Sequence, residues 1–291
     1  MDEPEQGANV DATWEEARAA NLANWNDRVP IHVEGYGIEA FADPAHLSDV
    51  ARTDLAAIAA YLPDGVAGLD VCHLQCHIGT DTVSFARSGA RVVGVDFSAP
   101  ALAAAAELAA STGVEAEWVH TDVLDARAAV DAQLGPDRFF DLVYTSIGTI
   151  TWLADLHRWA AQIEALLRPG GLFYIRDGHP AMHSLDEEAE GLVTRHRYFA
   201  DGRAQVWDFP TSYVGDALLE HTRTLEYPHP ISEIITAVLG SGLELVGFDE
   251  GDTLPWQFSE AMEDVGGGSY AYPAPLRECL PMTFTLVARK R

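Results

Sequence analysis

The chain has 291 residues, of which 48% are hydrophobic and 22% are charged. This is enough apolar material for one large domain or two small ones, and it excludes disorder over most of the length. Acidic residues outnumber basic residues by 45 to 18, which gives a net charge of −27. Such a chain repels phosphate backbones and anionic membranes, so we expect a small-molecule partner and neither nucleic acid nor membrane.

The sequence also lacks the marks of export. No apolar run approaches the roughly 18 residues of a membrane-spanning helix, and the start MDEPEQGANVDA has no signal-peptide pattern. Three cysteines (Cys72, Cys76 and Cys279) leave one unpaired, unlike a secreted disulfide framework. We therefore expect a cytoplasmic protein.

Helices are predicted first along the chain, and then strands and helices alternate. A helix is expected at residues 12–28, and a second at residues 43–62, with Asp43 as its N-cap and Pro44 in its first turn. Strands are predicted at residues 69–75, 91–95, 116–120, 140–145 and 172–175, with helices at residues 80–88, 98–112 and 153–167. This alternation predicts an α/β fold with a mostly parallel sheet and right-handed crossovers.

The last third differs in character. Strands of a hairpin-like insertion are predicted at residues 195–199, 205–209 and 218–227, followed by a helix at 231–239 and strands at 243–248 and 282–288. We expect an N-terminal helical segment, residues 1–65, and one α/β domain, residues 66–291, with the insertion at about residues 183–228.

Polar groups follow three successive strands of the predicted sheet. The first strand leads into the loop 73–81, the second ends at Asp96, and the third is followed by Asp122 and Val123. Ligands of such sheets bind beyond the carboxyl ends of the strands. A carboxylate there accepts hydrogen bonds from both ribose hydroxyls, and a side-chain acceptor beside a backbone amide suits the edge of an adenine. The pattern predicts an adenosine site.

The run LDVCHLQCHIGTDTVSFARSGARVVGVDFS, with HTDVLDA, FDLVYTSIG and LLRPGGLFYIRDGHP after it, resembles class I S-adenosylmethionine-dependent methyltransferases. The resemblance covers residues 69–180. It implies a Rossmann-like sheet whose last strand is antiparallel, an N-terminal helical lid, a β insertion after the fifth strand, and S-adenosylmethionine as the cofactor.

The resemblance also implies roles for individual residues. The cofactor-binding residues would be Gln75, His77, Gly79, Asp96, Phe97, Asp122, Val123 and Thr145, with Trp25 and His32 in the lid. The acceptor pocket would contain Tyr144 and Ser146, and candidates beyond the fifth strand are His183, Tyr213 and Trp256. Aromatic residues in that last third fit a core equally well.

The first loop departs from the family's pattern. An acid is expected at position 73 and glycines at positions 75 and 77, where this chain has His73, Gln75 and His77. Histidine tolerates a positive φ better than most residues, so the loop either keeps its shape through His77 or bends differently.

Cys72, His73, Cys76 and His77 resemble a set of metal ligands only at first sight. Strand alternation sends Cys72 and His73 to opposite faces, and no second pair of ligands follows. We therefore expect no metal site.

The expected function is methyl transfer to an oxygen, nitrogen or sulfur atom of a small acceptor, such as a secondary metabolite. His179, after the fifth strand, is the candidate general base, although it also fits a turn before Pro180. One alternative is an NAD(P)-dependent oxidoreductase, against which the missing G-x-G-x-x-G counts. Another is a non-catalytic S-adenosylmethionine-binding protein. The sequence predicts neither the acceptor nor the oligomeric state.

Overall fold

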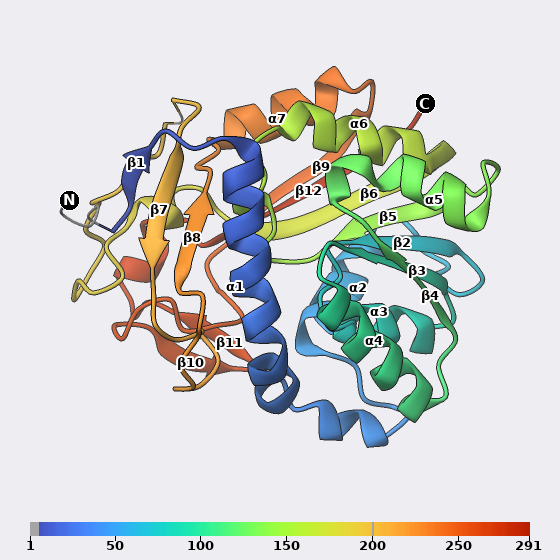
Figure 1. Cartoon of the computed structure of the whole chain (residues 1–291), viewed down its shortest axis with the longest axis horizontal. Helices are drawn as coiled ribbons and strands as arrows, with labels where there is room; N and C mark the ends of the chain where they lie inside the picture. The colour runs from blue at the N-terminus through green and yellow to red at the C-terminus, as the bar shows by residue number, and fades with distance from the viewer. Residues whose placement is uncertain (1–5, 200) are drawn as a thin grey trace.

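A seven-stranded sheet in the order β4-β3-β2-β5-β6-β12-β9 forms the centre of the computed structural model, which describes residues 6–199 and 201–291 (Figure 1). Its strands are β2 (Asp70–Leu74), β3 (Arg91–Asp96), β4 (Ala116–His120), β5 (Phe140–Thr145), β6 (Leu167–Gly178), β9 (Glu244–Gly251) and β12 (Thr283–Arg289). Only β12 runs antiparallel to its neighbours, β6 and β9. The predicted mostly parallel sheet with an antiparallel last strand is confirmed.

Helices cover both faces of this sheet. The core of one face is built from α5 (Ala126–Leu134), α6 (Leu156–Leu166) and α7 (Ile231–Gly240). The other face is covered by α2 (Asp49–Ile58), α3 (Thr80–Arg87) and α4 (Ala99–Thr112). Short 3₁₀ turns are η1 (Ile38–Ala42), η2 (Val123–Asp125), η3 (Ile150–Trp152), η4 (Met182–Ser184) and η5 (Leu276–Glu278). Because both faces are covered, β2 is buried at every position, including its polar residues Asp70 and His73.

A second, antiparallel sheet lies beside the first and is joined to it by the longest helix. It contains β1 (Ala8–Val10), β7 (Ala204–Asp208) and β8 (Arg223–Glu226). The helix α1 (Trp14–Gly35) stands between the two sheets in Figure 1. Its Asn21 side chain donates to the carbonyl of Leu225 and accepts from the amide of the same residue, at 2.7 and 2.8 Å. The N-terminal segment is thus held against the insertion.

The first two helices differ from their predicted bounds. α1 continues past residue 28 through Pro30 to Gly35. The second helix begins at residue 49, because Asp43 accepts from the amide of Ala45 in a tight turn, whereas the hydroxyl of Ser48 caps the amide of Ala51.

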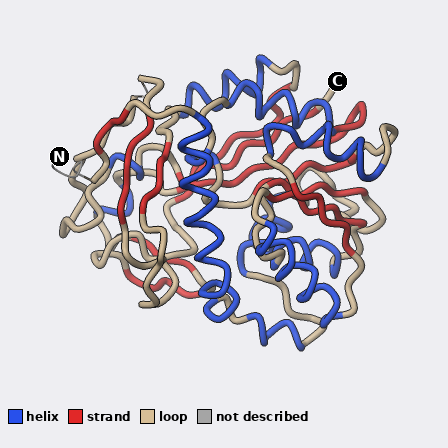
Figure 2. The backbone as a smooth tube through the Cα atoms, in the orientation of Figure 1, coloured by secondary structure: helices blue, strands red, loops and turns tan. Residues whose placement is uncertain are grey.

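The insertion contains less regular structure than predicted (Figure 2). Residues 195–199 form no strand, so this prediction is wrong, and of residues 218–227 only Arg223–Glu226 is one. The pairing of β1 with β7, and the hairpin of β10 (Glu263–Gly266) and β11 (Ser269–Ala271), were not predicted. Across the described residues, no helix has the length and apolarity that a bilayer crossing requires.

Candidate functional site

The loop after β2 keeps a left-handed backbone without its expected glycines. Gln75 and His77 have φ values of +57° and +48°, and Gly79, before α3, has +77°. A Cβ at Gly79 would lie 2.7 Å from that of Ala105, so this position requires glycine. The other two positions carry strain of about 1–3 kcal/mol each. The positive φ values at Gln75 and His77 agree with the first of the two predicted alternatives, in which the loop keeps its shape without glycines.

Asp96 joins this loop to the end of β3. One carboxylate oxygen accepts from the amide of His77 and the other from the amide of Ser98, both at 2.8 Å. The side chain is only 6% exposed, and burial raises the pKa of its carboxyl to about 6. Gln75 lies in the same loop. Its Nε2 donates to the carbonyl of Thr149, and its Oε1 is buried with no hydrogen-bond partner among the described residues.

Asp122 begins the turn after β4 and contacts the N-terminal helix. Its Oδ1 accepts from the amide of Leu124, and its Oδ2 accepts from Nε of Arg18 at 2.7 Å. An open depression beside it is lined by Trp14, Glu15, Arg18, His120, Thr121, Asp122, Asp125 and Arg158. Next to it, the carbonyl of Phe97 faces Nε2 of His120 at 3.0 Å. An amino group that approached Asp122 would have to displace Arg18 from one oxygen.

The helix α1 contacts the first loop through a pair of histidines. Nδ1 of His32 lies 2.8 Å from Nε2 of His77, and Nε2 of His32 lies 2.7 Å from the hydroxyl of Ser212. Burial lowers the pKa of His32 to about 2 and that of His77 to about 3, so both rings are neutral and one donates its proton to the other. The ring of Trp25 lies 5.1 Å from that of His77 and 5.4 Å from that of Trp152.

Asp177, at the end of β6, fixes the loop after β5. Its two carboxylate oxygens accept from the amides of residues 148, 149, 150 and 178 and from the hydroxyl of Thr149. Sequence reasoning missed this residue, although the signal was the same as for Asp96, an acid at the carboxyl end of a buried strand. The loop that it holds faces the insertion, because Thr151 contacts β8.

A cavity of about 40 Å³ lies between this loop, the end of β6 and the small sheet. Gln205 and Trp207 on β7 and Glu226 on β8 line it, with His183 opposite. Nε2 of Gln205 and Nε1 of Trp207 are buried donors that have no hydrogen-bond partner in the described part of the chain. One oxygen of Glu226 accepts from the hydroxyl of Thr151 at 3.1 Å, and burial raises the pKa of the Glu226 carboxyl to about 7.

Of the residues predicted for the acceptor pocket, His183 lines this cavity and the other four do not. Tyr144 lies in the core under α2, where its hydroxyl donates to Asp54 at 2.6 Å. Ser146 bonds His73, and Thr145 beside it is fully buried. Tyr213 and Trp256 lie near each other, with ring centroids 6.4 Å apart.

His179, the predicted base, lies outside the cavity lining. Its Nδ1 accepts from the amide of Ala181 at 3.1 Å, and its Nε2 lies 3.0 Å from a carboxylate oxygen of Glu250. The role of general base for His179 stays a prediction.

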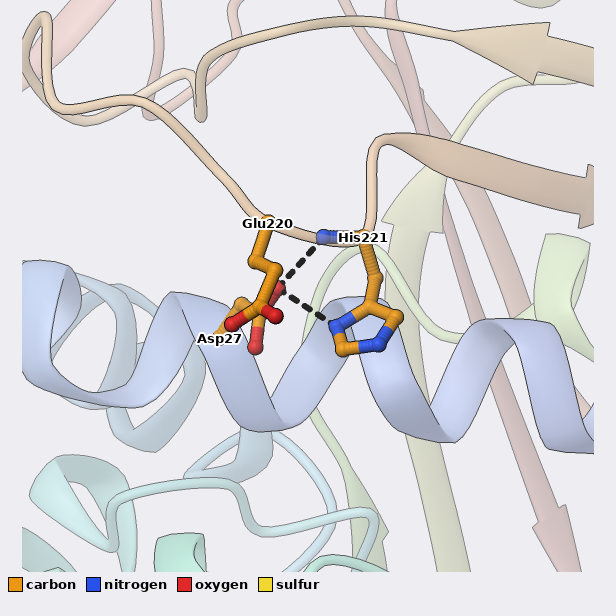
Figure 3. A group of neighbouring side chains, drawn as sticks. All are labelled: Asp27, Glu220 and His221. Carbon is orange, nitrogen blue, oxygen red and sulfur yellow. Dashed lines mark hydrogen bonds and ion pairs between the residues drawn. The ribbon is translucent and has the colours of Figure 1, made fainter.

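Among the described residues, one group has the spacing of metal ligands: Asp27, Glu220 and His221 offer atoms within 4.8 Å of one another (Figure 3). The same oxygen of Asp27 accepts from the backbone and from the ring of His221, so hydrogen bonds between α1 and the insertion account for the contact. Cys72 and Cys76 are buried free thiols.

The comparisons with known proteins agree with this geometry. Residues 72–173 match the family model of a methyltransferase domain. The chain is 31% identical over 110 residues to a ubiquinone biosynthesis O-methyltransferase of Bradyrhizobium sp., covering 38% of this chain and 40% of that protein. A second such enzyme, of Rhodopseudomonas palustris, is 30% identical over an equal length. The chain therefore matches about two fifths of the length of these relatives.

Solved structures extend the likeness over nearly the whole chain. The CcbJ methyltransferase of Streptomyces caelestis has a TM-score of 0.57 at 18% identity, covering 92% of this chain and 98% of that one. The 1,6-didemethyltoxoflavin-N1-methyltransferase of Burkholderia thailandensis, solved with S-adenosylhomocysteine, has a TM-score of 0.55 at 19% identity, covering 97% and 94%. Residues 72–173 thus match a methyltransferase domain, and the chain has the fold of class I S-adenosylmethionine-dependent methyltransferases.

Proposed function

We propose that this chain transfers a methyl group from S-adenosylmethionine to an oxygen, nitrogen or sulfur atom of a small molecule. The observation that carries the proposal is the buried carboxylate of Asp96, held against the first loop inside the segment that matches a methyltransferase domain. The names of the similar proteins describe methyltransferases of small molecules. This similarity favours methyl transfer over the activity of a nicotinamide-dependent oxidoreductase.

The residues around the first loop fit this cofactor. Asp96 would accept the ribose hydroxyls, Asp122 with the amide of Val123 would bind the adenine edge, and Phe97 would lie between them. The unpartnered Oε1 of Gln75 offers an acceptor to the amino-acid part, which Gly79, Thr145 and the α1 residues Trp25 and His32 would enclose. When bound, the cofactor supplies a methyl group on an electrophilic sulfonium, so the protein mainly orients the reactants and excludes water.

The cavity beneath the small sheet would receive the reacting group of the acceptor, because a volume of about 40 Å³ has room for only a few atoms. Gln205 and Trp207 would donate hydrogen bonds to its lone pairs, and Glu226 would take the proton of an attacking hydroxyl or amine. A carboxyl with a pKa of about 7 is well matched to proton transfer near neutral pH. We therefore assign to Glu226 the role that the sequence suggested for His179, and we keep His183 as a contact of the acceptor. Ser146, Tyr213 and Trp256 stay candidates for the entrance.

We further propose that the protein works in the cytoplasm and without nucleic acid. The buried free thiols of Cys72 and Cys76 are typical of a reducing compartment. The net charge of −27 would repel a phosphate backbone.

Calorimetric titration of the whole chain tests the proposal. S-adenosylmethionine and S-adenosylhomocysteine should bind in the micromolar range, and NADH, the control, should not bind. Phenols, heteroaromatic amines and thiols are then screened for formation of S-adenosylhomocysteine. Binding of NADH alone would refute the proposal, and cofactor binding without turnover of any acceptor would support a non-catalytic protein.

A further inference from the structure

Arg28 is a buried cation with no anionic partner among the residues that the structure describes. It lies on α1, it is 8% exposed, and it is the one buried arginine among the described residues. Its Nε donates to Oδ1 of Asn24 at 2.7 Å, while its two terminal nitrogens donate no hydrogen bond within residues 6–199 and 201–291. By contrast Arg176, which is also largely enclosed, lies 2.5 Å from the carboxylate of Asp54. A buried charge normally has such a partner.

Two aromatic rings hold the guanidinium of Arg28 in place. Its central carbon lies 5.2 Å from the ring centroid of Trp25 and 5.8 Å from that of Tyr213. These contacts compensate for part of the lost hydration but satisfy none of the N–H donors. Burial lowers the pKa of Arg28, yet an arginine stays charged at neutral pH. The side chain is therefore oriented, charged and short of acceptors.

Arg28 lies near residues of both the proposed cofactor site and the proposed acceptor site. On one side its helix carries Trp25 and His32, which contact His77 of the first loop. On the other side Tyr213 belongs to the connection between β7 and β8, and Arg28 lies close enough to Glu226 in the acceptor cavity for their charges to interact, although burial leaves the pKa of Arg28 lowered. The guanidinium thus lies where the amino-acid end of the cofactor and the acceptor would approach each other.

From these contacts we infer that Arg28 binds a carboxylate of one of the two substrates, an inference that rests on the proposed methyl transfer. The planar fork of a guanidinium matches the two oxygens of a carboxylate. The carboxylate comes either from the amino-acid part of the cofactor or from an acidic acceptor, and both sources present the same chemistry.

The first arm of the test uses calorimetry with S-adenosylhomocysteine and its decarboxylated analogue. The whole chain is compared with Arg28→Met, with Arg28→Lys, which keeps the charge but not the fork, and with Arg52→Met, an exposed control on α2. If the cofactor supplies the carboxylate, the wild type and the control should bind S-adenosylhomocysteine about 10- to 100-fold more tightly than the analogue. Arg28→Met should bind both equally, and Arg28→Lys should lie between.

The second arm titrates salicylate and its methyl ester into the protein saturated with S-adenosylhomocysteine. If the acceptor supplies the carboxylate, the preference for salicylate should disappear in Arg28→Met while the preference in the first arm persists. If Arg28→Met changes neither preference, the inference is overturned and the proposed function stands. If S-adenosylhomocysteine does not bind the wild type, the proposed function fails and the inference fails with it. Melting temperatures show whether each variant is folded.

Discussion

Replacing Asp177 by asparagine tests how the loop after β5 is held. Oδ1 of Asp177 accepts from the amides of Gly148 and Gly178, both at 2.6 Å, and Oδ2 accepts from the amides of Thr149 and Ile150 at 3.0 and 2.9 Å. An asparagine has the same shape, but one of its two ends is an NH₂ group. In either orientation, two backbone N–H groups then face a donor.

The expected loss follows from these contacts. A hydrogen bond to a charged group contributes about 1.5–3 kcal/mol, so losing two of them lowers the free energy of unfolding by about 4 kcal/mol. For a chain of this size, 1 kcal/mol shifts Tm by roughly 2–4 °C, so Tm should fall by roughly 8–16 °C. The loop also borders the cavity through Ile150 and Thr151, so the KM for any acceptor found should rise.

Thermal unfolding followed by circular dichroism measures the effect. Asp64→Asn is the matched control, because Asp64 is exposed in a turn after α2. A shift of about 2 °C is the smallest that 1 kcal/mol produces in a chain of this size. A Tm for Asp177→Asn that lies within about 2 °C of the control would therefore refute the reasoning about the loop.

The other predictions concern three more acids. Glu226→Gln should lower kcat about 10²- to 10⁴-fold. It should also abolish the rise in kcat/KM through pH 7 that a base with a pKa of about 7 produces, and an unchanged pH profile would exclude Glu226 as the base. Because burial raises the pKa of this carboxyl in the folded protein, wild-type stability should fall relative to that of the glutamine variant as the pH rises from 5 to 8, as urea unfolding at both pH values would show. Asp96→Ala should weaken binding of S-adenosylhomocysteine by about 1–3 kcal/mol in calorimetry, and equal affinity would remove Asp96 from the site. Asp54→Asn should cost about 3–5 kcal/mol in urea unfolding, since Arg176 would keep its buried charge without a counter-ion; a loss below about 1 kcal/mol would contradict this.

Much of the central sheet could be predicted because its signals are local. Buried parallel strands are short apolar runs, and Ser98 and Gly113 mark helix ends by their side-chain and backbone chemistry. The acid at the end of β3 was found from its place in the chain for the same reason. The antiparallel last strand followed from the family resemblance.

The rest depends on contacts between distant segments. β1 is a strand because β7, almost two hundred residues later, pairs with it, and no local pattern encodes that partner. His179 was chosen for its chemistry and its position after a strand, and only the fold shows that its Nε2 lies 3.0 Å from a carboxylate oxygen of Glu250 on β9. Glu226 gave no signal, because an acid becomes a candidate base only when the fold buries it beside a cavity.

The way α1 is attached has a kinetic consequence. Asn21 bonds it to β8, His32 bonds it to both the first loop and Ser212, and β1 at its start pairs with β7. Under the proposed function, the segments that cover the proposed cofactor and acceptor sites therefore move together. An opening wide enough to exchange the cofactor would also expose the methylated product, so the two departures should share a single rate constant, and inhibition by S-adenosylhomocysteine should depend on acceptor concentration.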